Sequence, residues 1–194
     1  MGLGARIVLV ILLLLSIWSV GIMIDRRSVF KKELGGARLE DGKKFVAAKD
    51  WVALKAWAEA NPSVMSGAIL SALNTGSHQS EAIDRAVQSF FSEKRLQLEK
   101  GLNFLATLAA NAAFIGLLGT VMGIIQSFGI LSSQQGSAMN AVMFGLAEAL
   151  LSTAVGIFVA VPAAIAYNHF AQKLRNATLE ASSLKDLYVA KAGT

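Results

Sequence analysis

The chain has 194 residues, of which 54% are hydrophobic and only 16% are charged, and its mean hydropathy is +0.53. A soluble domain of this length carries roughly 25% charged residues, so the composition favours a membrane protein over a soluble one. The net charge of +5 would also suit nucleic acid, but the basic residues gather beside apolar runs, and without cysteine there is neither a disulfide framework nor a thiolate metal site.

The first apolar run is Ile7–Ile24, IVLVILLLLSIWSVGIMI. At 1.5 Å per residue, a helix of this length reaches about 27 Å, just enough to cross the hydrocarbon core of a bilayer. A cleaved signal peptide is the alternative, but the run is long and DRRSVFKK follows it, which is typical of a membrane boundary. We therefore expect an external segment at 1–6 and a retained transmembrane helix at 7–24.

The charges on either side of this run predict its orientation. The basic residues that follow it closely are Arg26, Arg27, Lys31 and Lys32. Only Arg6 precedes it, and the segment 25–100 holds 13 of the 18 Lys and Arg residues. Because cytoplasmic loops are enriched in Lys and Arg, we expect the N-terminus outside and 25–100 in the cytoplasm.

The segment 25–100 reads as helical. KKFVAAKDWVALKAWAEANP predicts one helix that stops before Pro62, and SGAILSALNTGS predicts a short helix and a turn. From Ser80, a possible N-cap, apolar residues recur every three or four positions and no proline intervenes before Pro162. We therefore expect one continuous helix from about Ser80 to Leu131, so that 25–100 ends in a cytoplasmic extension of the second transmembrane helix.

Two further apolar runs complete the predicted topology. Residues 101–131 and 141–168 are long enough to span a bilayer, and SSQQGSAMN at 132–140, which lacks Lys and Arg, is typical of an external turn. Lys173 and Arg175 mark the return to the cytoplasm, where 169–194 should continue as helix. The prediction is an all-α protein with three transmembrane helices, the N-terminus outside and the C-terminus in the cytoplasm.

Small residues recur at helical spacing in the second and third runs. Those that we expect at a helix-packing surface, together with the proline of the third run, are Gly116, Gly119, Gly123, Gly145, Gly156 and Pro162. Such stripes allow the backbones of membrane helices to approach closely. Packing accounts for most of these residues without any further function.

The polar residues of the same runs suggest a function in addition to helix packing. Thr120 and Thr153 lie roughly 16–20 Å from the outer turn at the helical rise, near mid-membrane, and Ser152 is beside them. Glu148 is the only charged side chain between Lys100 and Lys173. It lies about 12 Å from the outer turn at the helical rise, nearer the outside than the threonines. An acid placed there costs about 2–3 kcal/mol and should face protein or water. Two interpretations stay open: a packed glutamate that is protonated or hydrogen-bonded, or part of an ion path.

The same residues carry a family resemblance. FIGLLGTVMGIIQSF and GLAEALLSTAVGIFVAVPAAIAYNHFAQKL strongly resemble the second and third spans of the ExbB/TolQ proton-channel proteins, distant relatives of the flagellar stator MotA. The resemblance implies that Thr120 and Thr153 line a pore and that Glu148 is the family's third-span glutamate. It also implies a pentamer around two copies of an ExbD/TolR-like single-span partner, which supplies the aspartate that takes up the proton.

Other chemistry finds little support in the sequence. There is no Gly-rich phosphate loop after a strand, no Ser-His-Asp set and no aromatic and basic nucleic-acid surface, and His78 and His169 lack ligand-like spacing. We expect no enzymatic activity, no cofactor, no metal site and no nucleic-acid partner. A secondary transporter is also disfavoured, because three spans without an inverted repeat provide no midplane substrate site.

The leading hypothesis is a subunit of a proton-driven energy transducer in the inner membrane of a Gram-negative bacterium. It would act with its ExbD/TolR-like partner on a TonB-like, TolA-like or motility protein that spans the envelope. A stator of the gliding-motility type and a structural scaffold without ion flux are the alternatives. The choice between H⁺ and Na⁺, the stoichiometry and the kind of motion stay open at this point.

Overall fold

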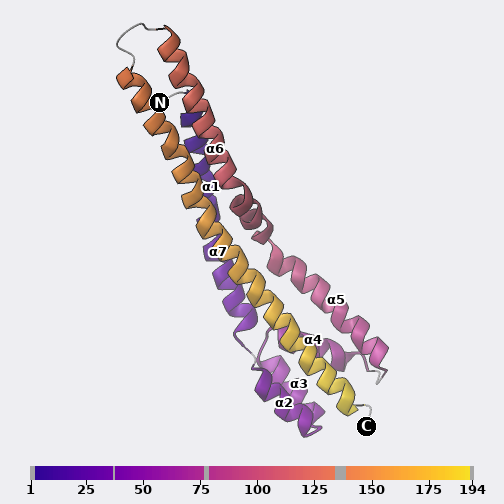
Figure 1. The fold of residues 1–194 in the computed structure, drawn as a ribbon. Coiled ribbons are helices and arrows are strands. Elements are labelled where there is room, and N and C mark those ends of the chain that lie inside the picture. The colour runs from indigo at the N-terminus through magenta and orange to yellow at the C-terminus, as the bar shows by residue number, and fades with distance from the viewer. Residues whose placement is uncertain (1–2, 37, 77–78, 134–138, 193–194) are drawn as a thin grey trace. The chain divides into compact units, whose positions relative to one another are not determined.

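The computed structural model describes residues 3–36, 38–76, 79–133 and 139–192. Within these ranges the chain forms helices joined by short connections, without a strand (Figure 1). The helices are α1 (Leu3–Leu34), α2 (Leu39–Ala47), α3 (Trp51–Ala60), α4 (Val64–Asn74), α5 (Ser80–Glu99), α6 (Leu102–Ser133) and α7 (Met139–Ala192). The predicted all-α class is confirmed.

Three helices of the described part are long and apolar enough to cross a membrane. They are α1, α6 and α7, which contain the three apolar runs, so the prediction of three spans is confirmed. As predicted, the third of them continues as helix past Tyr167, to Ala192. Most of the expected turn at 132–140 lies outside the described residues.

The chain divides into two compact units. We call Met1–Ile24 with Gly101–Asn168 the membrane unit, because it contains the apolar runs, and Asp25–Lys100 with His169–Thr194 the polar unit. In the membrane unit, segments of α1, α6 and α7 run side by side (Figure 1). The first of these buries one stripe at helical spacing, Ala5, Val8, Leu12 and Ser19.

The polar unit has a core of large aliphatic and aromatic side chains. Val46, Leu54, Ile69, Ile83 and Leu184 are all fully buried in it. Trp51 meets Tyr188 edge to face, with ring centroids 5.1 Å apart. Helices of 9 to 20 residues from four separate stretches therefore pack against the C-terminal part of α7.

The prediction of one helix before Pro62 is wrong in the middle of the segment. The chain forms α2 and α3, separated at Ala48–Asp50, where Lys49 has a φ of 55°. Asp50 starts the second helix, because its side chain accepts a hydrogen bond from the Ala53 N–H at 2.9 Å. The predicted stop is confirmed, since α3 ends at Ala60.

The prediction of one continuous helix from Ser80 to Leu131 is also wrong. α5 ends at Glu99 and α6 begins at Leu102, with Gly101 at a φ of +82° between them. Glycine adopts this conformation without steric cost, so it can end a helix where other residues would continue it. The predicted cap is displaced as well: the N-cap is Gln79, without a side-chain hydrogen bond, and Ser80 is the first helical residue.

Candidate functional site

The backbones of α6 and α7 touch along a seam of small residues in the membrane unit. A methyl group at Gly116 would lie 2.7 Å from the Ser152 carbonyl oxygen and 3.1 Å from the Gly156 Cα. At Gly156 it would lie 2.6 Å from the Ala112 carbonyl oxygen. Any side chain at either glycine would collide with backbone, so these two positions bring the helices to their closest approach.

The seam continues toward the end of α6. A methyl group at Gly119 would meet the Ser152 Cβ at 2.7 Å, and one at Gly123 would meet the Ala149 Cβ at 2.6 Å. Gly145 lies against the Ser127 hydroxyl. Five of the residues expected at a packing surface thus lie at this seam. Pro162 differs from them, because it lies inside α7 with an exposed ring.

The two threonines singled out in the sequence face each other across the seam. The Thr153 hydroxyl donates to the Thr120 Oγ1 at 3.5 Å, and the Thr120 hydroxyl donates to the Leu117 carbonyl at 2.7 Å. Thr120 is buried, whereas Thr153 is half-buried. Antiparallel helices therefore place two hydroxyls at the same level, as the sequence distances from the outer turn predict.

Ser152 is next to this pair and is fully buried. Within the described part of the chain, its Oγ has no hydrogen-bond partner. A buried hydroxyl without a partner is destabilising by about 1–3 kcal/mol. If position 152 only packed against α6, alanine would make the seam more stable than serine. The Ser152 hydroxyl therefore needs an explanation other than packing.

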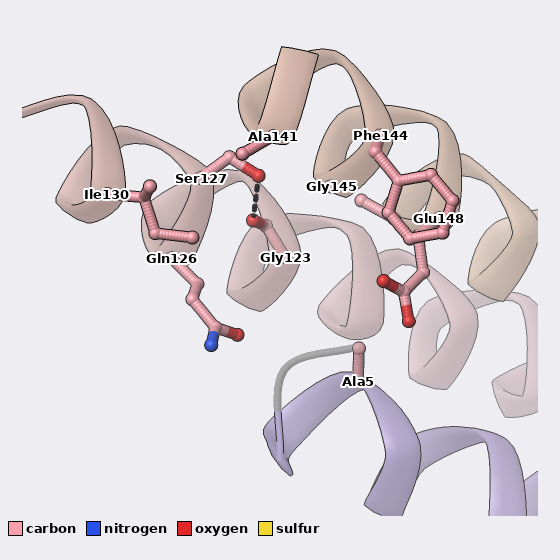
Figure 2. Close-up of a pocket in the computed structure, with 10 residues that line it drawn as sticks. Ala5, Gly123, Gln126, Ser127, Ile130, Ala141, Phe144, Gly145 and Glu148 are labelled. Atoms are coloured by element: carbon pink, nitrogen blue, oxygen red, sulfur yellow. Dashed lines mark hydrogen bonds between the residues drawn. The ribbon is translucent and has the colours of Figure 1, made fainter. Parts of the chain in front are cut away.

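Glu148 lies one helical turn from Ser152, toward the start of α7, and lines a pocket of about 230 Å³. Residues of α1, α6 and α7 line this open pocket, and they include Ala5, Gln126, Ser127 and Phe144. Figure 2 shows the Glu148 carboxylate beside Ala5. Its Oε1 atom is buried. The carboxylate thus lies inside the protein at the end of the membrane unit where α6 ends and α7 begins.

Sequence reasoning missed part of this pocket. Ala5 comes from the first apolar run, and nothing in its neighbourhood in the sequence points to Glu148. Gln126 could have been found, because it is a polar residue in a run of apolar side chains and is followed by the hydroxyl of Ser127. In the part of the chain that the structure describes, no three His, Asp or Glu side chains lie close enough together to hold a metal ion.

These features define a class: a helical membrane protein whose last two spans meet at a glycine seam that carries hydroxyls and one carboxylate. Comparison with known families makes the assignment specific. Residues 56–182, more than half of the chain, match the MotA/TolQ/ExbB proton channel family. The chain belongs to this family, and the resemblance seen in the sequence is confirmed.

The similar proteins carry two kinds of name. The Tol-Pal system protein TolQ of Pseudomonas aeruginosa is 43% identical over 93 residues, which are 48% of this chain and 40% of TolQ. The biopolymer transport protein ExbB of Xanthomonas campestris is 39% identical over 94 residues, 48% of this chain and 37% of that ExbB. The ExbB of Aquifex aeolicus is 42% identical over 96 residues, 48% of this chain and 65% of its own. The matches thus span less than half of the first two relatives.

Proposed function

We propose that this chain is the channel subunit of a proton-driven motor in the bacterial inner membrane, in a TolQ-like or ExbB-like role. Several copies, five on the family resemblance, surround two copies of a single-span partner that resembles ExbD or TolR. The complex uses the proton motive force to do mechanical work on an envelope-spanning protein. The N-terminus faces outward and the C-terminus lies in the cytoplasm. The role needs no covalent chemistry.

The observation that carries this proposal is the hydroxyl pair of Thr120 and Thr153, 3.5 Å apart in the apolar seam. Hydroxyls both donate and accept hydrogen bonds, so they can bind a partner carboxyl group whether it is protonated or ionised. Thr153 is only partly buried, so part of its side chain remains accessible for such a contact from another chain. Protonation of the partner aspartate would neutralise it and allow its helix to move along this wall.

Glu148 supports the proposal by its position. It is the one acidic residue between Lys100 and Lys173, and it lies in the pocket that Ala5, the neighbour of Arg6, also lines. A negative charge near the outer side attracts protons toward the path. A membrane potential of 100 mV supplies about 2.3 kcal/mol per proton, so substantial work requires several protons in succession.

The test replaces both hydroxyls by methyl groups of similar size. We expect Thr120→Val with Thr153→Val to abolish proton flux in proteoliposomes that contain the chain and its single-span partner, while the complex still assembles. The matched control is Thr107→Val, since Thr107 is an exposed threonine of the same helix whose hydroxyl donates to the Asn103 carbonyl at 2.9 Å. Wild-type flux in the double variant would remove the threonines from the path.

The same measurement separates a channel from a scaffold. A scaffold shows no flux in the wild-type complex, with or without the partner. Glu148→Gln sharpens the distinction: in a channel it lowers flux more than stability, whereas loss of the assembled oligomer with unchanged flux per complex would assign Glu148 to packing.

A further inference from the structure

The pocket beside Glu148 lies within a single chain, and residues of three separate helices line it. We propose that it is an outer vestibule that holds water and hydronium next to Glu148, with Ala5 of α1 as the part of its wall that keeps it open. This inference rests on the proposed function, because it supplies the route by which protons reach the channel from outside.

The size of the pocket fits water, and polar groups of Glu148 and Gln126 can bind it on a lining that is otherwise mostly apolar. A volume of about 230 Å³ holds several molecules, since one ordered water needs about 10–15 Å³ measured in this way and two to four polar partners. Glu148 offers carboxylate oxygens and Gln126 an amide. The Ser127 hydroxyl is buried and donates to the Gly123 carbonyl at 2.9 Å, so it lines the pocket without being needed to bind water. Solvation by water also lowers the free energy of a carboxylate at this depth.

The vestibule ends at the seam. Just beyond it, the Gly123 backbone contacts Ala149 and the Gly119 backbone contacts Ser152, at distances that leave no space for a methyl group. A water molecule is as large as a methyl group, so a water chain along the seam of one protomer is excluded at these levels. Protons that gather beside Glu148 must therefore leave sideways, toward another chain. A dead-end vestibule of this kind agrees with a path that is completed by a partner helix.

α1 is held in place at this level by close packing. Ala5 is only 3% exposed, and Val8, on the same face, would lie 3.0 Å from a methyl group at Gly119. Gly4 is similarly close to the Met122 sulfur, with 3.1 Å between that atom and a methyl group at Gly4. Because this helix cannot shift readily, a larger side chain at Ala5 would grow into the pocket and displace water from Glu148.

The first experiment uses the absence of cysteine from the chain, which allows single thiols to be introduced without background. Gln126→Cys puts a thiol at the open side of the pocket, because Gln126 lines the pocket and is itself exposed, and Ile125→Cys, one residue away and 67% exposed on the apolar surface, is the control. The probe is a membrane-impermeant cationic methanethiosulfonate applied to the outer face of spheroplasts. We expect at least tenfold faster labelling of the Gln126→Cys chain. Equal rates, or labelling only from the cytoplasmic side, would overturn the vestibule.

The second experiment fills the pocket without touching an ionisable group. In the Gln126→Cys background, Ala5→Leu should slow labelling at least tenfold, and in the otherwise wild-type chain it should lower proton flux at least fivefold. Gly21→Leu is the matched control, because Gly21 lies on the same helix with no atom within 4 Å of an added methyl group. Unchanged labelling and flux in a folded Ala5→Leu chain would overturn the proposal.

These experiments distinguish a failure of the vestibule proposal from a failure of the proposed channel function. If Ala5→Leu fails to fold, the smaller Ala5→Val takes its place, and the labelling of Gln126→Cys already decides whether the pocket is hydrated. Rapid labelling without any flux in the wild-type complex would contradict the channel function and leave the vestibule standing. Flux in the wild-type complex without labelling of the pocket would contradict the vestibule and leave the channel function standing.

Discussion

The two units of this chain have opposite constructions. In the membrane unit, small and polar side chains such as Ala112, Thr120 and Ser152 are buried, while Phe114 and Phe158 are 68% and 77% exposed. In the polar unit, large apolar side chains such as Ile69 and Leu184 are fully buried. The polar unit thus has the interior of a soluble protein, and the membrane unit is inverted at its α6–α7 seam, although leucines such as Leu12 and Leu105 are also buried in it.

The difference follows from the solvent of each unit. Lipid is as apolar as a leucine side chain, so burying large apolar groups brings no hydrophobic gain there, and close backbone contact between small residues holds the helices together. In water, burial of apolar area dominates the stability of a fold. Changes in size should therefore have opposite effects in the two units: adding atoms disrupts the membrane unit, and removing them disrupts the polar unit.

The largest effect is expected from adding atoms at the seam. Gly116→Leu would push a side chain into the Ser152 and Gly156 backbones, and because backbone cannot move aside, the loss should exceed the usual 1–3 kcal/mol of an overpacked core. We expect no monodisperse oligomer on gel filtration in detergent. Gly129→Leu on the same helix, with no atom within 4 Å of an added methyl group, should behave as wild type. Equal tolerance of both substitutions would contradict the inverted construction.

Removing atoms should be most damaging in the polar unit. Leu184 is fully buried in its core, so Leu184→Ala should lower the free energy of unfolding by about 2–5 kcal/mol through lost burial and the remaining cavity. Thermal unfolding followed by the fluorescence of Trp51 and Trp57 measures this, because both tryptophans pack against the same core.

The control for this change is the same substitution at an exposed site. Leu96 is 77% exposed in the same unit, so Leu96→Ala should change the free energy of unfolding by no more than about 0.5 kcal/mol. A loss at Leu96 as large as that at Leu184 would mean that Leu96 is buried by another chain.

The sequence predicted the membrane unit better than the polar unit, and the reason is the strength of the local signal. Runs such as Ile7–Ile24 can be recognised from their length and composition. In two antiparallel spans, the number of residues between each threonine and the outer turn is enough to place Thr120 opposite Thr153. Ala5 could not be placed beside Glu148, because the contact between these residues depends on how three helices pack and not on any local pattern.

The predicted helices were too long at two places, one inside the polar unit and one at Gly101, the first residue after its segment Asp25–Lys100. Both breaks lie where a single residue adopts a positive φ, Lys49 at 55° and Gly101 at +82°. The apolar spacing continues through each break, so periodicity alone predicts one helix. At the first break, Asp50 could have indicated the start of a new helix, since aspartate is a preferred N-cap residue. At the second break, Gly101 could have indicated the end of a helix.

The break between α5 and α6 gives a smaller prediction. Gly101→Ala should destabilise the chain by about 1–2 kcal/mol, because a residue with a Cβ is strained at a φ of +82°, and the added methyl group would also lie 3.1 Å from the Ile22 side chain. Gly21→Ala, at a position with open space around it and helical backbone, is the control. Thermal unfolding in detergent compares the two variants, and an unchanged midpoint for Gly101→Ala would show that the break can convert to helix without strain.

The smallest effect on stability is expected from charged side chains at the edge of the core of the polar unit, where the result does not depend on adding or removing atoms. The Lys185 ammonium donates to Asp84 at 2.6 Å and pairs with Asp186 at 2.7 Å. Burial opposes the charged form, but hydrogen bonds to Asp186 and Asp84 outweigh it, so the pKa of Lys185 is raised above its ordinary value of 10.5. A raised pKa means that the folded state holds this proton more tightly than the unfolded state, so the stabilisation is complete below pH 10.5 and is lost as the pH rises through the folded-state pKa.

Asp84→Asn should therefore lower the unfolding midpoint by only a degree or two at pH 7–9, equivalent to about 0.5–1 kcal/mol, since Asp84 is partly exposed and Asp186 remains as a partner. Its difference from wild type should shrink above pH 10.5, where Lys185 begins to lose its charge. Glu81→Gln in the same helix is the matched control, because Glu81 and its partner Arg85 are 77% and 78% exposed and their pair should contribute nothing measurable. A pH-independent difference for Asp84→Asn would assign its effect to packing and not to the charge of Lys185.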